Sequence, residues 1–220
     1  MGYLKGKAIL LNAPKGAGKD TLGKALSERT GTSLREYKAI LYDRTAEQFN
    51  VPVDVVRGLN EDRERKEVPT NLFTIPVIEF VRLTRITKKY DDPRKSNFVV
   101  PLSVREALIY TSEVIIKPQH GKTYFGTEVA RHLDFDNGTI ITDSGFDEEV
   151  IPIVDACGVE NVIIVKFTRN GTTFDGDSRT WLTPPEGCAV ITATNDGDID
   201  SFVNFVEEKL KIICNVDEGC

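Results

Sequence analysis

Short apolar runs alternate with amphipathic segments along most of this 220-residue chain. An apolar run bounded by turn residues is typical of a buried strand, whereas apolar residues spaced three and four apart indicate a helix. Strands that alternate with helices predict a parallel sheet with right-handed crossovers. The predicted strands are residues 8–11, 138–144, 161–167 and 187–193, and the predicted helices are 21–29, 124–133, 146–157 and 198–213.

The middle of the chain is less regular. We expect a short strand over residues 35–40 that leads into a helix over 42–49, and another short helix over 53–59. The basic stretch 82–95 ends in a turn-forming Asp-Asp-Pro sequence, so we expect a surface excursion there rather than part of the core.

A capping box marks the start of one further helix. Ser103 and Glu106 have the spacing at which each side chain bonds the backbone of the other residue. Lys117-Pro118 is expected to end the helical run, because the residue before a proline is biased away from helical geometry.

A glycine-rich turn joins the first predicted strand to the first predicted helix. Gly16 and Gly18 let the backbone curl with its N–H groups turned inward, and the following helix adds the positive end of its dipole. Lys19 can then reach the terminal phosphates of a nucleotide, which is the arrangement of a phosphate-binding loop. The residues that we assign to ATP binding here are Lys15, Gly16, Ala17, Gly18, Lys19, Asp20 and Thr21.

The match to the usual phosphate-binding motif has two departures. Ala13 replaces the first glycine, and Asp20 replaces the hydroxyl residue that normally contacts Mg²⁺, with Thr21 one place later. Either Asp20 or Thr21 would contact the metal. The alternative is an ordinary strand-to-helix turn that uses glycines for its geometry.

Asp143 is the second candidate ligand for Mg²⁺. It follows an apolar strand, and a carboxylate at that place holds the metal in nucleotide-hydrolysing or nucleotide-transferring folds, usually through water. The alternative is that Asp143 or Ser144 caps the helix that follows.

Phosphoryl transfer needs positive charge around the transferring group. Candidates are Lys15 and Lys19 in the loop, Arg105 on a helix, Arg169 at a strand end, and Arg179. Arg179 lies in a glycine-rich segment without helical or strand periodicity. We expect that segment to be a mobile lid that brings arginines over the phosphates and excludes water.

Composition narrows the class of protein. A content of 40% hydrophobic and 28% charged residues is typical of a globular domain, and the length allows one α/β domain with insertions. The net charge of −6 makes the chain a poor candidate for coating nucleic acid. No apolar run approaches membrane-spanning length, and residues 1–7 lack the apolar part of a secretory signal. We therefore expect a cytoplasmic protein that binds neither membranes nor nucleic acid.

Four stretches together resemble one family, the phage-type deoxynucleoside monophosphate kinases within the P-loop nucleotide kinase family. They span most of the chain, and the last two are more diagnostic than the loop alone. The residues that carry the resemblance are 15–21, 62–69, 103–109 with 112–113, 117–118 and 121–126, and 142–146 with 174–179.

The resemblance implies a fold and a reaction. The fold would be a single P-loop kinase domain over 1–220, of three-layer α/β/α type with a central parallel sheet. It would carry a monophosphate-binding insertion at about 36–101 and a lid at about 169–182. The reaction would be Mg²⁺-assisted transfer of a phosphoryl group from ATP to a deoxynucleoside monophosphate, giving the diphosphate and ADP. A homodimer is compatible with the resemblance, and the location would be the host cytoplasm for a viral protein.

On the acceptor side, the resemblance implies that Arg105 holds the phosphate of the monophosphate, together with Arg63 or Lys66. Tyr124 would stack on the acceptor base. Phe125 is a second stacking candidate, although a place in the core suits it equally well.

On the donor side, the resemblance implies that Arg169 and Arg179 act on the donor phosphates and the transferring group. Lys19 and Mg²⁺ would hold the donor, and Asn195 would lie by the adenine. The acceptor oxygen is already anionic, so no general base is needed.

Two alternatives stay open. One is a P-loop kinase that acts on a non-nucleotide phosphate. The other is a nucleotide-binding module without catalytic activity, which the unusual Asp20 keeps in consideration.

Overall fold

The structure is a computed structural model that describes residues 2–216. It divides into two compact units. The first, called the sheet unit, comprises the chain up to Tyr37 and from Phe125 onward, and the second, the inserted unit, is Lys38–Tyr124. The resemblance implies an insertion at about 36–101, and the inserted unit spans Lys38–Tyr124. The prediction of one domain over 1–220 stays a prediction.

The sheet unit is built on five strands that pair in parallel in the order β2-β5-β1-β6-β7. Apolar residues at matching positions meet along it, because Ile9 lies opposite both Ile140 and Ile163. The predicted parallel α/β architecture is therefore confirmed. The strand bounds are β1 Ala8–Asn12, β2 Ser33–Arg35, β5 Thr139–Ile141, β6 Val162–Thr168 and β7 Ala189–Thr194.

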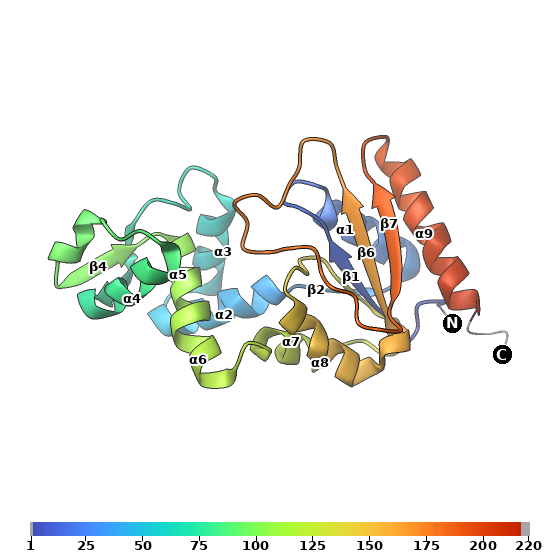
Figure 1. Cartoon of the computed structure of the whole chain (residues 1–220), viewed down its shortest axis with the longest axis horizontal. Helices are drawn as coiled ribbons and strands as arrows, with labels where there is room; N and C mark the ends of the chain where they lie inside the picture. Colours follow the sequence, from blue (N-terminus) through green and yellow to red (C-terminus); the bar gives the residue numbers. More distant parts are fainter. Residues whose placement is uncertain (1, 217–220) are drawn as a thin grey trace. The chain divides into compact units, whose positions relative to one another are not determined.

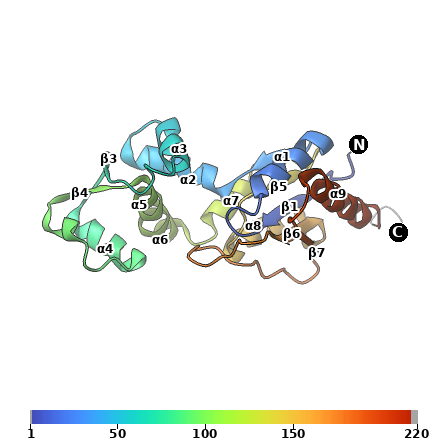
Figure 2. The same ribbon diagram turned by 90° about the horizontal axis from the view of Figure 1, so that it is seen from above.

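Helices lie on both faces of this sheet (Figure 1, Figure 2). On one face, α1 (Lys19–Thr30) and α9 (Ile199–Val216) share a buried cluster with Ile9, Leu11 and Val165 of the strands. On the other side, α8 (Asp147–Cys157) packs against β6. The remaining pieces are α7 (Tyr124–Ala130) and the short η3 (Val159–Asn161). This is a central sheet flanked by helices.

The inserted unit has a hydrophobic core of its own. Its two strands, β3 (Thr70–Pro76) and β4 (Val99–Leu102), are antiparallel. Their inward residues, including Phe73 and Val100, are fully buried. The helical elements of this unit are α2 (Tyr37–Phe49), α3 (Val53–Glu61), α4 (Val77–Thr87), η1 (Pro93–Ser96), α5 (Val104–Ile109), η2 (Tyr110–Ile116) and α6 (Lys117–His120).

Three expectations about the middle of the chain are wrong. The strand expected over 35–40 ends at Arg35, and α2 begins at Tyr37. Pro118 does not end the helical run, because the proline lies at the start of α6, which continues to His120. The stretch 82–95 is not merely a surface excursion, because Leu83 is 1% exposed in the core of the inserted unit.

No helix within residues 2–216 is long and apolar enough to span a membrane.

Candidate functional site

The glycine-rich loop follows β1 and enters α1 without a side-chain cap. Gly18 is the N-cap residue with φ 104°, and Gly16 has φ 84°, both in the left-handed region that favours glycine. A Cβ at Gly18 would also lie only 2.8 Å from Nδ2 of Asn195. Gly18 supplies no side-chain cap, so the N-terminus of α1 is a place where an anionic ligand could accept from backbone N–H groups.

Asn195, predicted to lie by a donor adenine, contacts this loop directly. Its Nδ2 donates to the carbonyl of Ala17 at 2.8 Å, and its own N–H donates to Thr168 at 2.8 Å. The residue is 7% exposed. Asn195 therefore fixes the loop to the ends of β6 and β7. Its role toward adenine stays a prediction.

Lys19 is buried, and its ammonium is turned onto the loop. Nζ donates to the carbonyl oxygens of Ala13 at 2.5 Å and Pro14 at 2.9 Å. Burial, and next to it the positive charge of Arg179, lowers the pKa of Lys19 to about 8, although three carboxylates oppose the shift. The ammonium thus lies within electrostatic reach of Arg179 and of a group of acids.

Those three acids come from separate segments that the fold brings together. Asp20 lies in the first turn of α1, Asp143 follows β5, and Asp177 belongs to the irregular segment between β6 and β7. Asp20 and Asp143 are the acids that the sequence predicts as metal ligands. Asp177 had no predicted role, because an acid in an irregular segment carries no periodic signal.

Arg179 lies along the backbone at Gly145. A Cβ added at Gly145 would lie 2.6 Å from both Cβ and Cγ of Arg179, and the N–H of Thr180 donates to the Gly145 carbonyl at 3.0 Å. The Arg179 guanidinium donates to both carboxylate oxygens of Asp177, at 3.2 and 2.9 Å. Burial opposes its charge, but these bonds raise the pKa of Arg179 above its ordinary value, so the arginine stays charged.

Asp143 is 8% exposed, and its Oδ1 accepts a hydrogen bond from the N–H of Tyr37 at 2.9 Å. Mg²⁺ is usually held by one or two carboxylates together with substrate phosphates and water. The oxygen donors of Asp143 and Asp20, both near Lys19, fit that requirement. Within the described residues, no group of three or more His, Cys, Asp or Glu side chains is arranged to hold a metal without such help.

Three other predicted donor residues lie at the same end of the sheet but on its surface. Lys15 and Thr21 are exposed in and after the loop. Arg169 is exposed directly after β6, and its carbonyl accepts from the N–H of Thr172 at 3.0 Å. The structure does not place the Arg169 side chain in contact with Lys19 or Arg179.

One polar residue at this end of the sheet was missed. Asn12, the last residue of β1, is 0% exposed. Its amide bonds the backbone at Ser144, Thr180 and Leu182. The only sequence signal was a polar residue at the end of an apolar run.

In the inserted unit, the structure brings Arg105 next to the charged segment 62–67. The N–H of Arg105 donates to the carbonyl of Lys66 at 3.3 Å, and its guanidinium lies 3.4 Å from the carboxylate of Glu67. Arg63 is exposed on the same segment. Arg105 therefore adjoins the segment that carries Arg63 and Lys66, a segment with charges of both signs.

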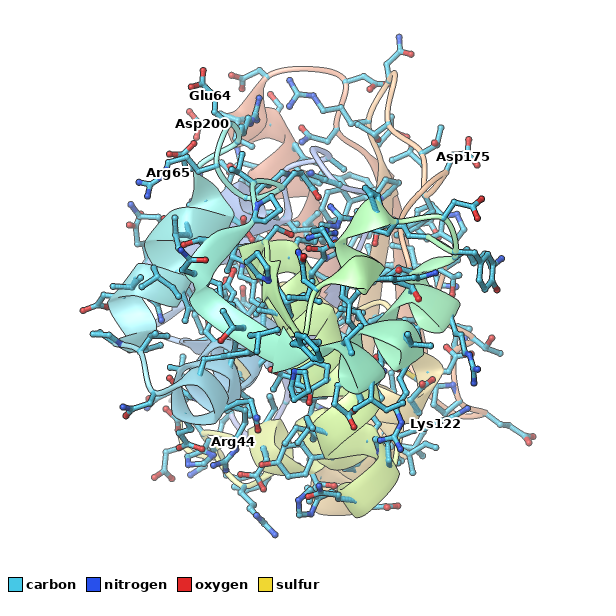
Figure 3. All side chains as sticks on the ribbon, turned by 90° about the vertical axis from the view of Figure 1, so that its left-hand side faces the viewer. Arg44, Glu64, Arg65, Lys122, Asp175 and Asp200 are labelled. Carbon is cyan, nitrogen blue, oxygen red and sulfur yellow. The ribbon has the colours of Figure 1, made fainter. Side chains whose placement is uncertain are left out.

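Tyr124 contacts Arg44, another residue of the inserted unit. Its hydroxyl accepts from Nε of Arg44 at 2.7 Å, and the Arg44 guanidinium lies 5.8 Å from the centre of its ring. Figure 3 shows Arg44 and Arg65 well apart on the inserted unit. The stacking alternative, Phe125, is 3% exposed, as expected for a core residue.

A scan against protein-family models finds no match for this chain, and a search of curated proteins finds no similar sequence.

Proposed function

We propose that this protein transfers a phosphoryl group from ATP to a deoxynucleoside monophosphate, giving the diphosphate and ADP. The observation that carries the proposal is the buried Lys19 ammonium on a glycine-rich loop, with Arg179 and Asp143 within electrostatic reach. Two cations and an acid at the N-terminus of a helix suit a polyphosphate and its metal ion.

Binding of the donor would use groups that already lie at the loop. The N–H groups at the start of α1 would donate to phosphate oxygens, and Lys19 would exchange its bonds to Ala13 and Pro14 for bonds to phosphate. Arg179 would stabilise charge on the transferring group. Asp143 and Asp20 would hold Mg²⁺, which when bound would neutralise phosphate charge.

The acceptor would bind to the inserted unit. Arg105, with Lys66 or Arg63, would supply the cationic groups for a monoester phosphate, and Arg105 would exchange its pairing with Glu67 for the phosphate. The acceptor oxygen needs no deprotonation, so positioning and charge neutralisation would suffice.

The test is an ADP-release assay with each of the four deoxynucleoside monophosphates and with their ribose forms. ADP release that depends on one or more of them supports the proposal, and none with any of them overturns it. In that case ADP release with other phosphates would indicate a kinase of a non-nucleotide substrate. Tight ATP binding without turnover would indicate a binding module.

A substitution at Arg105 tests whether this residue binds the monophosphate rather than ATP. Arg105→Ala is expected to raise KM for the monophosphate at least about tenfold and to leave ATP affinity nearly unchanged. The matched control is Arg82→Ala, because Arg82 is an exposed arginine on α4 that pairs with Glu79. A collapse of ATP affinity in Arg105→Ala would mean that the assigned role is wrong.

A further inference from the structure

Asn12 is a polar residue in a strand of the sheet that is buried along its whole length. All five residues of β1 are buried, and Asn12 is 0% exposed. Burying an amide side chain is unfavourable unless its donors and its acceptor find partners. The identity of those partners therefore indicates what the residue does.

The amide of Asn12 bonds three backbone groups. Nδ2 donates to the carbonyl of Ser144 at 3.1 Å and to the carbonyl of Thr180 at 3.0 Å. Oδ1 accepts from the N–H of Leu182 at 2.9 Å. Both N–H groups and the oxygen are thus satisfied by main-chain atoms.

These partners lie next to the candidate donor-binding residues. Ser144 follows Asp143 in sequence, and Thr180 follows Arg179. Asn12 itself immediately precedes the loop that leads to Lys19. One side chain therefore connects the three segments that carry Lys19, Asp143 and Arg179.

Further contacts hold the same segment to the sheet unit. The N–H of Thr183 donates to Asp147 at 2.8 Å, and Leu182 is 1% exposed. The part of the expected lid that follows Arg179 is therefore anchored. At Thr180 the anchors are the Asn12 amide, which donates to the carbonyl, and the Gly145 carbonyl, which accepts from the N–H.

We propose that Asn12 is a positioning residue that fixes the backbone directly after Asp143 and directly after Arg179 relative to the glycine-rich loop. Its effect on turnover rests on the proposed function. The positioning itself is a property of the protein without substrate, and it can be measured separately.

Two variants remove the amide. Asn12→Leu keeps a similar volume and removes all three bonds, and Asn12→Ser is a smaller change that keeps one hydroxyl. The matched controls are Asn161→Leu and Asn161→Ser. Asn161 also donates from its amide to a carbonyl, that of Cys157 at 2.7 Å, but it precedes β6 and so lies at the opposite end of the strand.

The first measurement uses no substrate. Trp181, the only tryptophan of the chain, lies between Thr180 and Leu182 and packs edge-on against Phe174 with ring centres 5.0 Å apart. We expect Asn12→Leu to shift its emission and to speed amide exchange at Leu182 at least about tenfold, with no such change in Asn161→Leu. A folded Asn12→Leu with native emission and native exchange would overturn the proposal. If Asn12→Leu does not fold, Asn12→Ser and Asn161→Ser decide by the same criteria.

The second measurement is turnover. We expect kcat to fall about 30-fold or more in Asn12→Leu while KM for ATP changes less than about threefold, because Arg179 would act on the transition state. An unchanged kcat in the folded variant would overturn the proposal. A wild-type protein that releases no ADP refutes the proposed function instead, and the emission and exchange measurements then judge the positioning alone.

Discussion

At the scale of single residues, the surroundings of Lys19 favour loss of the proton from its ammonium group. Burial and the charge of Arg179 lower its pKa to about 8, so the free protein loses the ammonium as pH rises through that value. We therefore predict that ATP affinity is constant at pH 6 to 7 and weakens by about tenfold for each pH unit well above 8. Fluorescence titration of Trp181 with ATP at a series of pH values measures this.

The control for the pH profile is Lys19→Met, which has no titrating group at this position. It should bind ATP weakly, and its affinity should not change near pH 8. If wild-type affinity stays flat up to pH 9.5, the ammonium does not contact the polyphosphate.

Gly145 provides a second prediction at this scale. Any Cβ there would lie 2.6 Å from the base of the Arg179 side chain, which cannot move aside without its backbone. We predict that Gly145→Ala lowers kcat about tenfold or more and destabilises the protein by about 1–3 kcal/mol. Steady-state kinetics and thermal unfolding check both.

The matched substitution is Gly58→Ala on α3, where a Cβ meets nothing within 4 Å. It should leave kcat unchanged and stability equal or slightly higher, because alanine favours a helix. Native kcat in Gly145→Ala would show that Arg179 has no catalytic role.

Lys19 and Asp143 could be predicted because each follows a recognisable strand, and Arg179 was predicted from its glycine-rich segment and from the resemblance of residues 174–179. Asn12 was missed, since the partners of that side chain are backbone atoms 132 to 170 residues away. The placement of Tyr124 by the acceptor base, which rests on the resemblance, stays a prediction; in the structure the Tyr124 hydroxyl accepts a hydrogen bond from Arg44. Pairwise contacts between distant side chains leave no periodic signal in a sequence.

At the scale of elements, the sheet strands were predictable because each is an apolar run between turn residues. The helical run after Ser103 was predicted too short. It passes through a π-helix at Tyr110–Ile116, and Pro118 lies at the start of α6, where proline is tolerated. The elements β3, α4 and β4 were not predicted. Pro76 interrupts the apolar pattern before α4, and the many basic residues around Leu83 give no sign that this leucine is buried.

The basic stretch has a structural role that its composition did not indicate. Arg94 donates to both oxygens of Glu106, at 3.0 and 2.7 Å, and also pairs with Asp92. Glu106 is 6% exposed and also completes the capping box with Ser103. The stretch is therefore bound to the start of α5, next to Arg105.

We predict that Arg94→Met destabilises the inserted unit by about 3 kcal/mol, because it leaves the Glu106 carboxylate buried with fewer partners. Adding Glu106→Gln should recover part of this loss, because the remaining group is neutral. Chemical denaturation followed by circular dichroism measures both variants.

The Arg94–Glu106 pair also makes the stability of the inserted unit depend on pH in the acid range. Burial tends to raise the pKa of Glu106, but the hydrogen bonds from Arg94 and Ser103 outweigh it and hold the pKa below its ordinary value. A lowered acid pKa stabilises the fold at neutral pH, and this contribution is lost as pH falls below about 4.5. Glu106→Gln should show a weaker dependence there. An equal dependence in both proteins would contradict the assignment.

At the scale of the whole molecule, the candidate residues divide between the two units. The donor candidates Lys19, Asp143, Arg179 and Asn195 belong to the sheet unit, and the acceptor candidates Arg63, Lys66 and Arg105 belong to the inserted unit. The inserted unit holds 15 Lys and Arg against 12 Asp and Glu, although the whole chain is acidic. A cationic unit suits a small anionic acceptor.

Each unit also has its own core. A core substitution in one unit should therefore weaken the binding of one substrate more than that of the other. Phe73 in the inserted unit is 0% exposed and packs against Phe49 at 5.3 Å between ring centres. Phe167 in the sheet unit is 1% exposed and packs against Phe202 at 5.2 Å. Either substitution by alanine is expected to remove about 3–5 kcal/mol from its own core.

We predict that Phe73→Ala raises KM for the monophosphate while ATP affinity and the unfolding transition reported by Trp181 stay near wild type. Phe167→Ala should do the reverse, lowering ATP affinity and the temperature of the Trp181 transition, because Trp181 lies in the sheet unit. Calorimetry reports the unfolding of both units, and Trp181 fluorescence reports that of the sheet unit. Comparing the two methods therefore distinguishes the two unfolding transitions. Equal shifts of one common transition in both variants would mean that the cores unfold together, and equal losses of both substrates would contradict the division of donor and acceptor residues.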